Sequence, residues 1–289
     1  MKCMEEKRKE NGENFTPWSE DHQNVFIASD LRIDKERVVL NGEQDKRIVV
    51  SKYMPLSRFS DAVKNKKFAF LSPLLWTDPF EMLFYNNKLH IDNEDYCINA
   101  CCFAGNDIQN EEGFWNVWGK GSKEPIIRVT YDLTKLLVAL SNRTTNGLSF
   151  YLGAMKYLSR FSLLRKKEES MNKTYRSVSE YLKDCLLKRD AYSYEIELRL
   201  FAVSTIGKEK DVFNIEGIDY ATGIVADVTL PPLEPLGNSH PSLMMYKCMQ
   251  DCVNMSIKLK IDNLIKEGIL KCHIYQSALY CTDIKERVY

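Results

Sequence analysis

The residues best suited to catalysis lie in one short run, YEIELRLF at positions 194–201. Alternating polar and apolar residues predict a β-strand, in which every second side chain shares a face. Glu195, Glu197 and Arg199 then point the same way, with the two carboxylates about 7 Å apart along the strand. Both acids can reach one sugar-sized ligand, and Arg199 holds one of them ionised. The alternative interpretation is a solvent-facing strand with a ladder of ion pairs.

A second group of candidates, SPLLWTDPFE at positions 72–81, follows a short apolar strand. It combines aromatic side chains with two acids and turn-setting prolines, a composition typical of loops that line pockets. Ser72, Asp78 and Phe80 are its candidate ligand-binding residues, whereas the role of Glu81 stays open. The alternative is an Asp-Pro turn whose aromatic side chains pack inward.

Two further groups carry positive charge. Lys52 and Tyr53 end a predicted strand, where a cation and a phenol can clamp a ribose or a phosphate. The run RFSLLRKK at positions 160–167 is basic and helical in pattern, so it is either a solvated helix end or a local phosphate-binding face. Its candidate nucleic-acid contacts are Arg160, Arg165, Lys166 and Lys167.

Several classes of protein are excluded by what the sequence lacks. It contains no phosphate-binding loop of the GxxxxGK(S/T) type, no GxGxxG after a strand, no HExxH and no GxSxG. The nine cysteines form no CxxC pair and the four histidines stand far apart, so we expect no metal site. Such cysteines are typical of a reducing cytosol.

Charge and hydropathy limit the partners. The 40 basic and 40 acidic residues give a net charge of zero, which argues against binding nucleic acid by bulk electrostatics but permits local patches. No run approaches the roughly 20 apolar residues of a membrane helix, and the N-terminus resembles no secretory signal. We therefore expect a cytoplasmic protein without membrane contact.

The surrounding pattern predicts an α+β fold, with one domain at residues 25–289 behind a polar segment at 1–24. Apolar stripes predict a helical insertion at about 141–187, including a first helix from Leu148 to Leu158. A loop carries Trp115 and Trp118. Strands are expected at 25–27, 37–40, 47–50, 68–71, 97–103, 126–131, 192–203, 223–230 and 271–279, and helices at about 56–67, at 132–140 and from Pro241.

Taken together, these groups resemble a widespread bacterial family catalogued as a domain of unknown function. Its pattern includes Asn-Asp-Pro-Phe-Glu and, later, Lys-x-x-x-Trp-x-x-Glu-x-Glu-x-Arg. Here the matching stretches are residues 77–81 and 188–199, within a resemblance over about 48–281. Thr77 replaces the usual Asn, and Tyr192 replaces the usual Trp.

The order of strand, helix, strand and late Glu-x-Glu strand also resembles the ADP-ribosyltransferase fold. This resemblance implies that NAD is the substrate and that Glu197 bonds the nicotinamide ribose. Glu195 is then the general base for the acceptor. The implied NAD contacts are Lys52, Tyr53, Ser72, Asp78, Phe80, Tyr192 and Arg199, with Phe80 or Tyr192 stacked on nicotinamide.

Bacterial enzymes that resemble this fold and lack a secretion signal often act as toxins in toxin–antitoxin or phage-defence modules. The resemblance therefore implies an intracellular acceptor, either nucleic acid (RNA favoured over DNA) or protein, and a proteinaceous antitoxin as partner. Two alternatives stay open. One is a non-catalytic nucleic-acid or protein-binding sensor on the same fold. The other is a Mg²⁺-dependent nuclease that uses Asp78, Glu81, Glu195 and Glu197.

Overall fold

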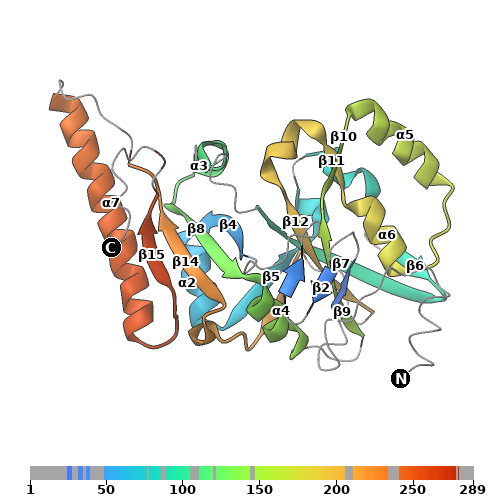
Figure 1. Ribbon diagram of the computed structural model, residues 1–289, viewed down its shortest axis with the longest axis horizontal. Coiled ribbons are helices and arrows are strands. Elements are labelled where there is room, and N and C mark those ends of the chain that lie inside the picture. Colours follow the sequence, from blue (N-terminus) through green and yellow to red (C-terminus); the bar gives the residue numbers. More distant parts are fainter. Residues whose placement is uncertain are drawn as a thin grey trace. The chain divides into compact units, whose positions relative to one another are not determined.

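The computed structural model divides the chain into two compact units, each assembled from three separate segments (Figure 1). The first unit comprises Met1–Ile48, Phe68–Gly105 and Leu137–Ile215, and the second comprises Val49–Lys67, Asn106–Leu136 and Glu216–Tyr289. The structure describes residues 25–27, 32–34, 37–39, 49–76, 78–85, 89–104, 111–119, 122–143, 147–205, 211–233, 241–277 and 279. The expected polar segment at 1–24 lies outside these residues. The single domain expected from residue 25 stays a prediction.

The main sheet of the first unit has the strand order β1-β9-β12-β7-β5-β13. The central strand β12 (Leu198–Ser204) pairs antiparallel with both β7 (Glu94–Phe103) and β9 (Leu148–Ala154). The remaining strands of this sheet are β1 (Val25–Ile27), β5 (Lys67–Leu71) and β13 (Val212–Glu216), with β6 (Leu89–Ile91) paired to β7. A separate two-stranded ladder joins β10 (Lys156–Leu158) to β11 (Leu187–Arg189).

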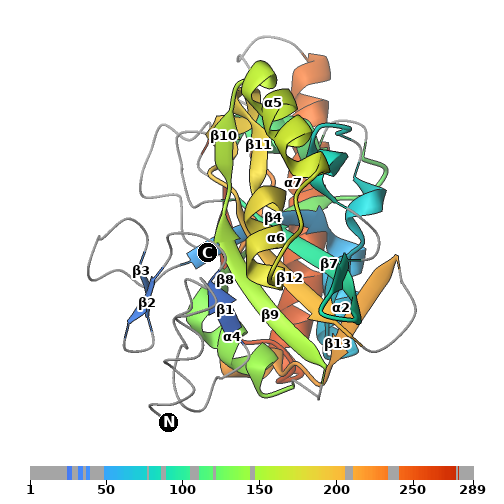
Figure 2. The same ribbon diagram turned by 90° about the vertical axis from the view of Figure 1, so that its right-hand side faces the viewer.

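One helix covers a face of this sheet (Figure 2). Helix α6 (Val178–Cys185) contributes Tyr181 and Leu182 to a hydrophobic core that also contains Tyr151 of β9 and Phe201 of β12. Its amphipathic spacing agrees with the stripe read from the sequence. Helix α5 (Arg160–Met171) instead buries only Leu163, so most of its surface faces solvent.

The helix expected from Leu148 to Leu158 is wrong, because the chain forms strands β9 and β10 there. Strand β9 is buried on both faces: Leu148 and Leu152 point to one side, and Tyr151 to the other. When apolar residues occupy both odd and even positions of a strand, some of them also match the three-and-four spacing of a helix. Periodicity alone therefore does not distinguish such a strand from a helix. The helical part of the expected insertion is confirmed only at α5 and α6.

The second unit contains a four-stranded sheet in the order β15-β14-β8-β4. Its strands are β4 (Val49–Pro55), β8 (Ile126–Asp132), β14 (Val225–Leu230) and β15 (His273–Gln276). The last three lie close to the expected ranges, whereas β4 overlaps the strand expected at 47–50 only at its start and continues to Pro55. Helices α2 (Leu56–Lys64) and α7 (Pro241–Lys266) contact each other, and α4 (Leu133–Ser141) follows β8. The α+β class is confirmed.

Two features of this unit differ from expectation. Trp115 and Trp118 lie on a helix, α3 (Glu111–Gly119), and not on a loop. On α7 the helical spacing of Cys248, Cys252 and Met255 predicts a buried face, but these side chains are exposed, and residues such as Ile257 are buried instead. Within the described residues, neither α7 nor any other helix is long and apolar enough to cross a bilayer.

Candidate functional site

The two motifs singled out in the sequence meet inside the first unit. Lys188 Nζ lies 2.5 Å from Glu81 Oε1, and Arg199 Nη2 lies 3.1 Å from Glu81 Oε2. A third ion pair joins Arg189 Nη2 to Asp78 Oδ2 at 3.0 Å. The Asp78–Glu81 loop is therefore held by cations from a segment more than a hundred residues later. We call Glu81, Lys188, Glu195, Glu197 and Arg199 the buried charge cluster.

Lys188 is the centre of this cluster. Besides Glu81, its Nζ contacts Glu195 Oε2 at 2.5 Å and Glu197 Oε2 at 2.8 Å, and its side chain is only 6% exposed. Burial by itself lowers the pKa of a lysine, but the three carboxylates outweigh burial and raise the pKa of Lys188. Lys188 is thus a fixed cation. Sequence reasoning gave it no role, although it opens the later motif.

Arg199 is the largest completely buried side chain among the described residues. Its Nε donates to Glu197 Oε1 at 2.6 Å, and its Nη1 donates to the Tyr85 hydroxyl at 3.2 Å. The guanidinium also lies 4.2 Å from the ring centroid of Trp76. A buried guanidinium is tolerated only when its donors are satisfied, and this one has partners from separate parts of the unit.

The Glu-x-Glu segment is not the strand that alternation predicted. Residues Asp190–Glu195 form a 3-10 helix, η4, and strand β12 begins only at Leu198. Between them Ile196 is left-handed, with φ 42° and ψ 52°, and its side chain is exposed. The reversal at Ile196 lets both carboxylates converge on Lys188, so ionic contacts override the alternating pattern.

Left-handed backbone is unusual for a β-branched residue and costs on the order of 1–3 kcal/mol. Neighbouring hydrogen bonds hold it: the backbone N–H of Glu197 donates to the Tyr157 hydroxyl at 2.8 Å, and Met155 N–H donates to Glu197 O at 2.9 Å. Strained backbone is frequent at functional sites, so the position of Ile196 between Glu195 and Glu197 supports these two acids as site residues.

The pKa values of the two acids shift in opposite directions. Burial, aided by the nearby charges of Glu197 and Glu81, raises the pKa of Glu195 against the opposing pull of Lys188. Burial also acts on Glu197, but Arg199 and Lys188 outweigh it and lower the pKa of Glu197 to about 2. Three carboxylates face two cations, so repulsion from the other two acids agrees with the raised pKa of Glu195. Pairs of acids with pKa values driven apart are typical of acid–base sites.

Access separates the same two acids. The side chain of Glu195 is 17% exposed and that of Glu197 only 5%. Both oxygens of Glu197 accept hydrogen bonds, from Arg199 and from Lys188. For Glu195, only Oε2 has a hydrogen-bond partner among the described residues. Glu195 is thus the carboxylate of this pair better placed to meet a ligand.

Aromatic rings flank the cluster, but cations already face them. The Arg189 guanidinium lies 4.6 Å from the Phe80 centroid and 5.1 Å from that of Tyr192, whose hydroxyl accepts from Nη2 at 3.0 Å. Burial leaves Arg189 Nε without a partner in the described part of the chain. The sequence analysis did not select Arg189 as a site residue. The only signal that could have indicated it is its position within the motif at residues 188–199.

The remaining predicted contacts are Ser72, Lys52 and Tyr53. Ser72 is buried and caps the 3-10 helix η1 (Pro73–Leu75), its Oγ accepting from Leu74 N–H at 3.4 Å. Lys52 and Tyr53 belong to the second unit, where the Tyr53 ring stacks on Phe114 at 5.3 Å between centroids. The ligand contacts proposed for Ser72, Lys52 and Tyr53 stay predictions.

The basic residues of α5 are partly paired. Lys166 Nζ lies 2.6 Å and Arg165 Nε 3.5 Å from Glu169, while the Arg160 guanidinium lies 5.6 Å from the Phe80 centroid. Lys167 forms no ion pair with a described residue, and it lines a pocket. The four cations therefore do not act as one uniform patch.

Among the residues with described positions, no group of three or more His, Cys, Asp or Glu side chains is arranged to hold a metal ion. Glu81, Glu195 and Glu197 do converge, but on the ammonium of Lys188. The lysine takes the position that a divalent cation would need.

No family model matches the chain. No curated protein matches it either.

Proposed function

We propose that this chain is an NAD-dependent ADP-ribosyltransferase in which Glu195 is the reacting carboxylate. The observation that carries the proposal is the pairing of Glu195, partly exposed and with a raised pKa, with Glu197, buried and held ionised. An ADP-ribosyltransferase-like core is part of the proposal. Its support is the late strand β12, which follows the Glu-x-Glu segment and pairs antiparallel with both of its neighbours.

The chemistry follows from these charges. The bond between ribose C1′ and the nicotinamide nitrogen breaks, and nicotinamide leaves with the electron pair as a neutral molecule. Positive charge develops on the ribose, as in glycoside cleavage. Three carboxylates against two cations give the cluster a formal charge of minus one, which favours such a charge nearby.

Glu195 then serves as general base. As the acceptor nucleophile bonds to C1′, its proton passes to the Glu195 carboxylate, whose raised pKa brings its proton affinity closer to neutral pH. Glu197, with both oxygens occupied, is a positioning residue that fixes Lys188 and Arg199. This division of roles revises the ribose contact predicted for Glu197. Phe80 and Tyr192 would accept nicotinamide only if Arg189 withdraws from their rings.

The biological part of the proposal is a cytoplasmic toxin of a toxin–antitoxin or phage-defence module. Its acceptor is nucleic acid, RNA before DNA, or protein, and its partner is a proteinaceous antitoxin. The partly basic face of α5 favours nucleic acid.

A second candidate, the non-catalytic sensor, has one observation in its favour. Most charged groups of the cluster are buried and paired, which is also the pattern of an ion network that only holds a loop in place. The nuclease alternative is less compatible with the geometry, since Lys188 occupies the centre of the carboxylates.

The deciding experiment incubates pure protein with NAD labelled in its ADP-ribose part and with total cell lysate. With wild type we expect label in nucleic acid or protein. Glu195→Gln should lower the labelling at least a hundredfold, which is the scale of a lost general base. The control is Glu168→Gln, an exposed acid of α5, and its labelling should equal that of wild type. If wild type transfers nothing and releases no nicotinamide, or if Glu195→Gln equals wild type, the transferase proposal fails and the sensor remains.

A further inference from the structure

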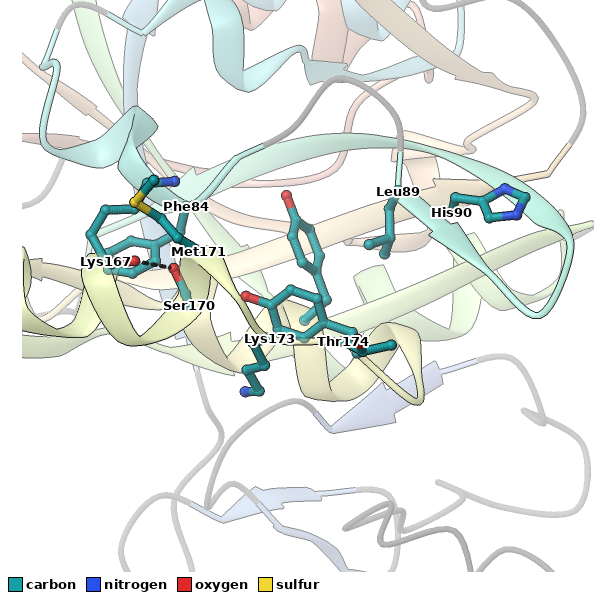
Figure 3. Close-up of a pocket in the computed structure, with 10 residues that line it drawn as sticks. Phe84, Leu89, His90, Lys167, Ser170, Met171, Lys173 and Thr174 are labelled. Atoms are coloured by element: carbon teal, nitrogen blue, oxygen red, sulfur yellow. Dashed lines mark hydrogen bonds between the residues drawn. The ribbon is translucent and has the colours of Figure 1, made fainter.

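A pocket of about 470 Å³ opens in the first unit, and none of its described lining residues belongs to the buried charge cluster. Figure 3 shows these lining residues. It is lined by the end of α5, the segment that joins α5 to α6, Tyr181 of α6, Phe84 of the 3-10 helix η2 (Glu81–Phe84), and β6. Its size lies within the range of sites for small molecules. All its described lining residues belong to one compact unit.

The charge of the lining has one sign. His90, Lys167 and Lys173 contribute three basic side chains, and none of the described lining residues is an Asp or Glu. Acids behind the lining already pair with two of these groups: His90 Nδ1 lies 2.8 Å from Asp95, and Lys173 Nζ lies 3.1 Å from Asp184 and 3.4 Å from Glu180. The C-terminal end of α5 opposes an anion with about half an elementary charge, which the full charge of Lys167 exceeds. The pocket therefore favours a negatively charged group.

Acids behind the lining hold its polar groups in place. Asp184 Oδ2 accepts from Lys173 Nζ at 3.1 Å and from the Tyr175 hydroxyl at 3.0 Å. Lys167, by contrast, forms no ion pair with a described residue, so its ammonium is the one best placed to meet a ligand anion. Preorganised side chains of this kind reduce the entropic cost of binding.

The remaining lining is aromatic and apolar. Tyr175 and Tyr181 meet edge to face with centroids 5.0 Å apart, beside Phe84 and Leu89. Tyr175 is half-buried, whereas Tyr181 is buried, so Tyr175 offers the more accessible ring. The Lys173 ammonium lies 4.8 Å from the Tyr175 centroid, so a base must stack on the part of the ring that Lys173 leaves open. Aromatic side chains next to lysines are the combination that binds a flat base together with its phosphate.

We propose that this pocket binds a nucleotide, with the base against Tyr175 and the phosphate on Lys167. The nucleotide is either free or one residue of a single strand, because both present the same chemistry. The inference does not require NAD chemistry. It also gives the basic end of α5 a defined target, which its paired residues Arg165 and Lys166 do not provide.

The test is isothermal titration with adenosine 5′-monophosphate, adenosine and hexa-adenylate, without NAD. We expect saturable binding of the monophosphate or of hexa-adenylate, and binding of adenosine weaker by about tenfold or more, as for the loss of a charge-assisted hydrogen bond. Binding of the monophosphate indicates a free nucleotide as ligand, and binding of hexa-adenylate alone indicates a nucleotide within a strand. Absence of saturable binding for both phosphorylated probes overturns the proposal.

Matched variants locate the site. Lys167→Ala should weaken binding about tenfold, while Lys166→Ala, on the same helix but paired with Glu169, should stay near wild type. Tyr175→Phe keeps the ring and should bind, whereas Tyr175→Ala should not, provided that thermal melting shows it folded. Equal losses in Lys166→Ala and Lys167→Ala overturn the proposal. Glu195→Gln should bind normally, so failure of the transferase proposal leaves this result unaffected.

Discussion

Arg199 Nη2 donates to Glu81 Oε2 at 3.1 Å and joins two residues that are 118 positions apart. The same guanidinium bonds Glu197, so a single cation connects the Asp-Pro-Phe-Glu loop to the Glu-x-Glu segment. Lys188 repeats the connection from the other side, contacting Glu81 and Glu197. The two motifs thus form one structure, whether it acts on a ligand or only holds the loop.

Removal of the Arg199 charge should be severe. Arg199→Met leaves Glu197 buried beside one cation in place of two, and we expect the free energy of unfolding to fall by about 3–5 kcal/mol, as for other broken buried ion pairs. Urea unfolding measures the change. Arg165→Met, which removes an exposed pair on α5, should cost less than about 1 kcal/mol. A similar small cost for Arg199→Met would contradict the network.

Stability should depend on pH through both acids, with opposite signs. The pKa of Glu197 is about 2 in the folded chain, below its unfolded value. The stability it contributes is therefore present above the unfolded pKa and is lost as pH falls toward 2. The pKa of Glu195 is raised, so its contribution is present below the unfolded pKa and is lost as pH rises through the folded value.

Unfolding in urea between pH 2.5 and 8 separates these contributions. In Glu197→Gln the free energy of unfolding should fall less steeply toward low pH than in wild type. In Glu195→Gln it should fall less as the pH rises toward neutral. Glu168→Gln, exposed on α5, supplies the unchanged profile. If the two cluster variants shift the profile in the same direction, the opposite pKa shifts are wrong.

The strain at Ile196 can be relieved. Asn tolerates left-handed backbone better than a β-branched residue does, and the side chain of Ile196 is exposed, so little packing is lost. Ile196→Asn should raise the free energy of unfolding by about 1 kcal/mol. Ile196→Val keeps the β-branch and should give no gain. Thermal melting compares the two, and a destabilised Asn variant would count against a strained turn.

Cysteine reactivity should follow burial. Cys248 and Cys252 are exposed on α7, whereas Cys101 and Cys185 are buried. Burial also raises the pKa of Cys185, which keeps it a thiol. In the native protein, a maleimide pulse followed by peptide mass spectrometry should label Cys248 and Cys252 before the other cysteines that the structure describes. Cys101 and Cys185 should react only after unfolding, and their early labelling would contradict the packing of the first unit.

The sequence by itself predicted the position of several strands correctly. Strands such as Ile126–Asp132 and Val225–Leu230 have apolar residues in compact runs bounded by turn residues, and they form where expected. The stretch from Leu148 was read as a helix because its residues are apolar on both faces. Only its pairing with β12 and β1 makes it a strand.

For the candidate site, the sequence by itself identified the two motifs and their acids. Residue types and spacing are local, and they were enough to select Asp78, Glu81, Glu195 and Glu197. Only the tertiary structure decided that Glu195 and Glu197 converge on Lys188, and that Ile196 turns the chain between them. The physical reason is that buried charges must find partners, and those partners come from segments whose sequence spacing says nothing about their distance.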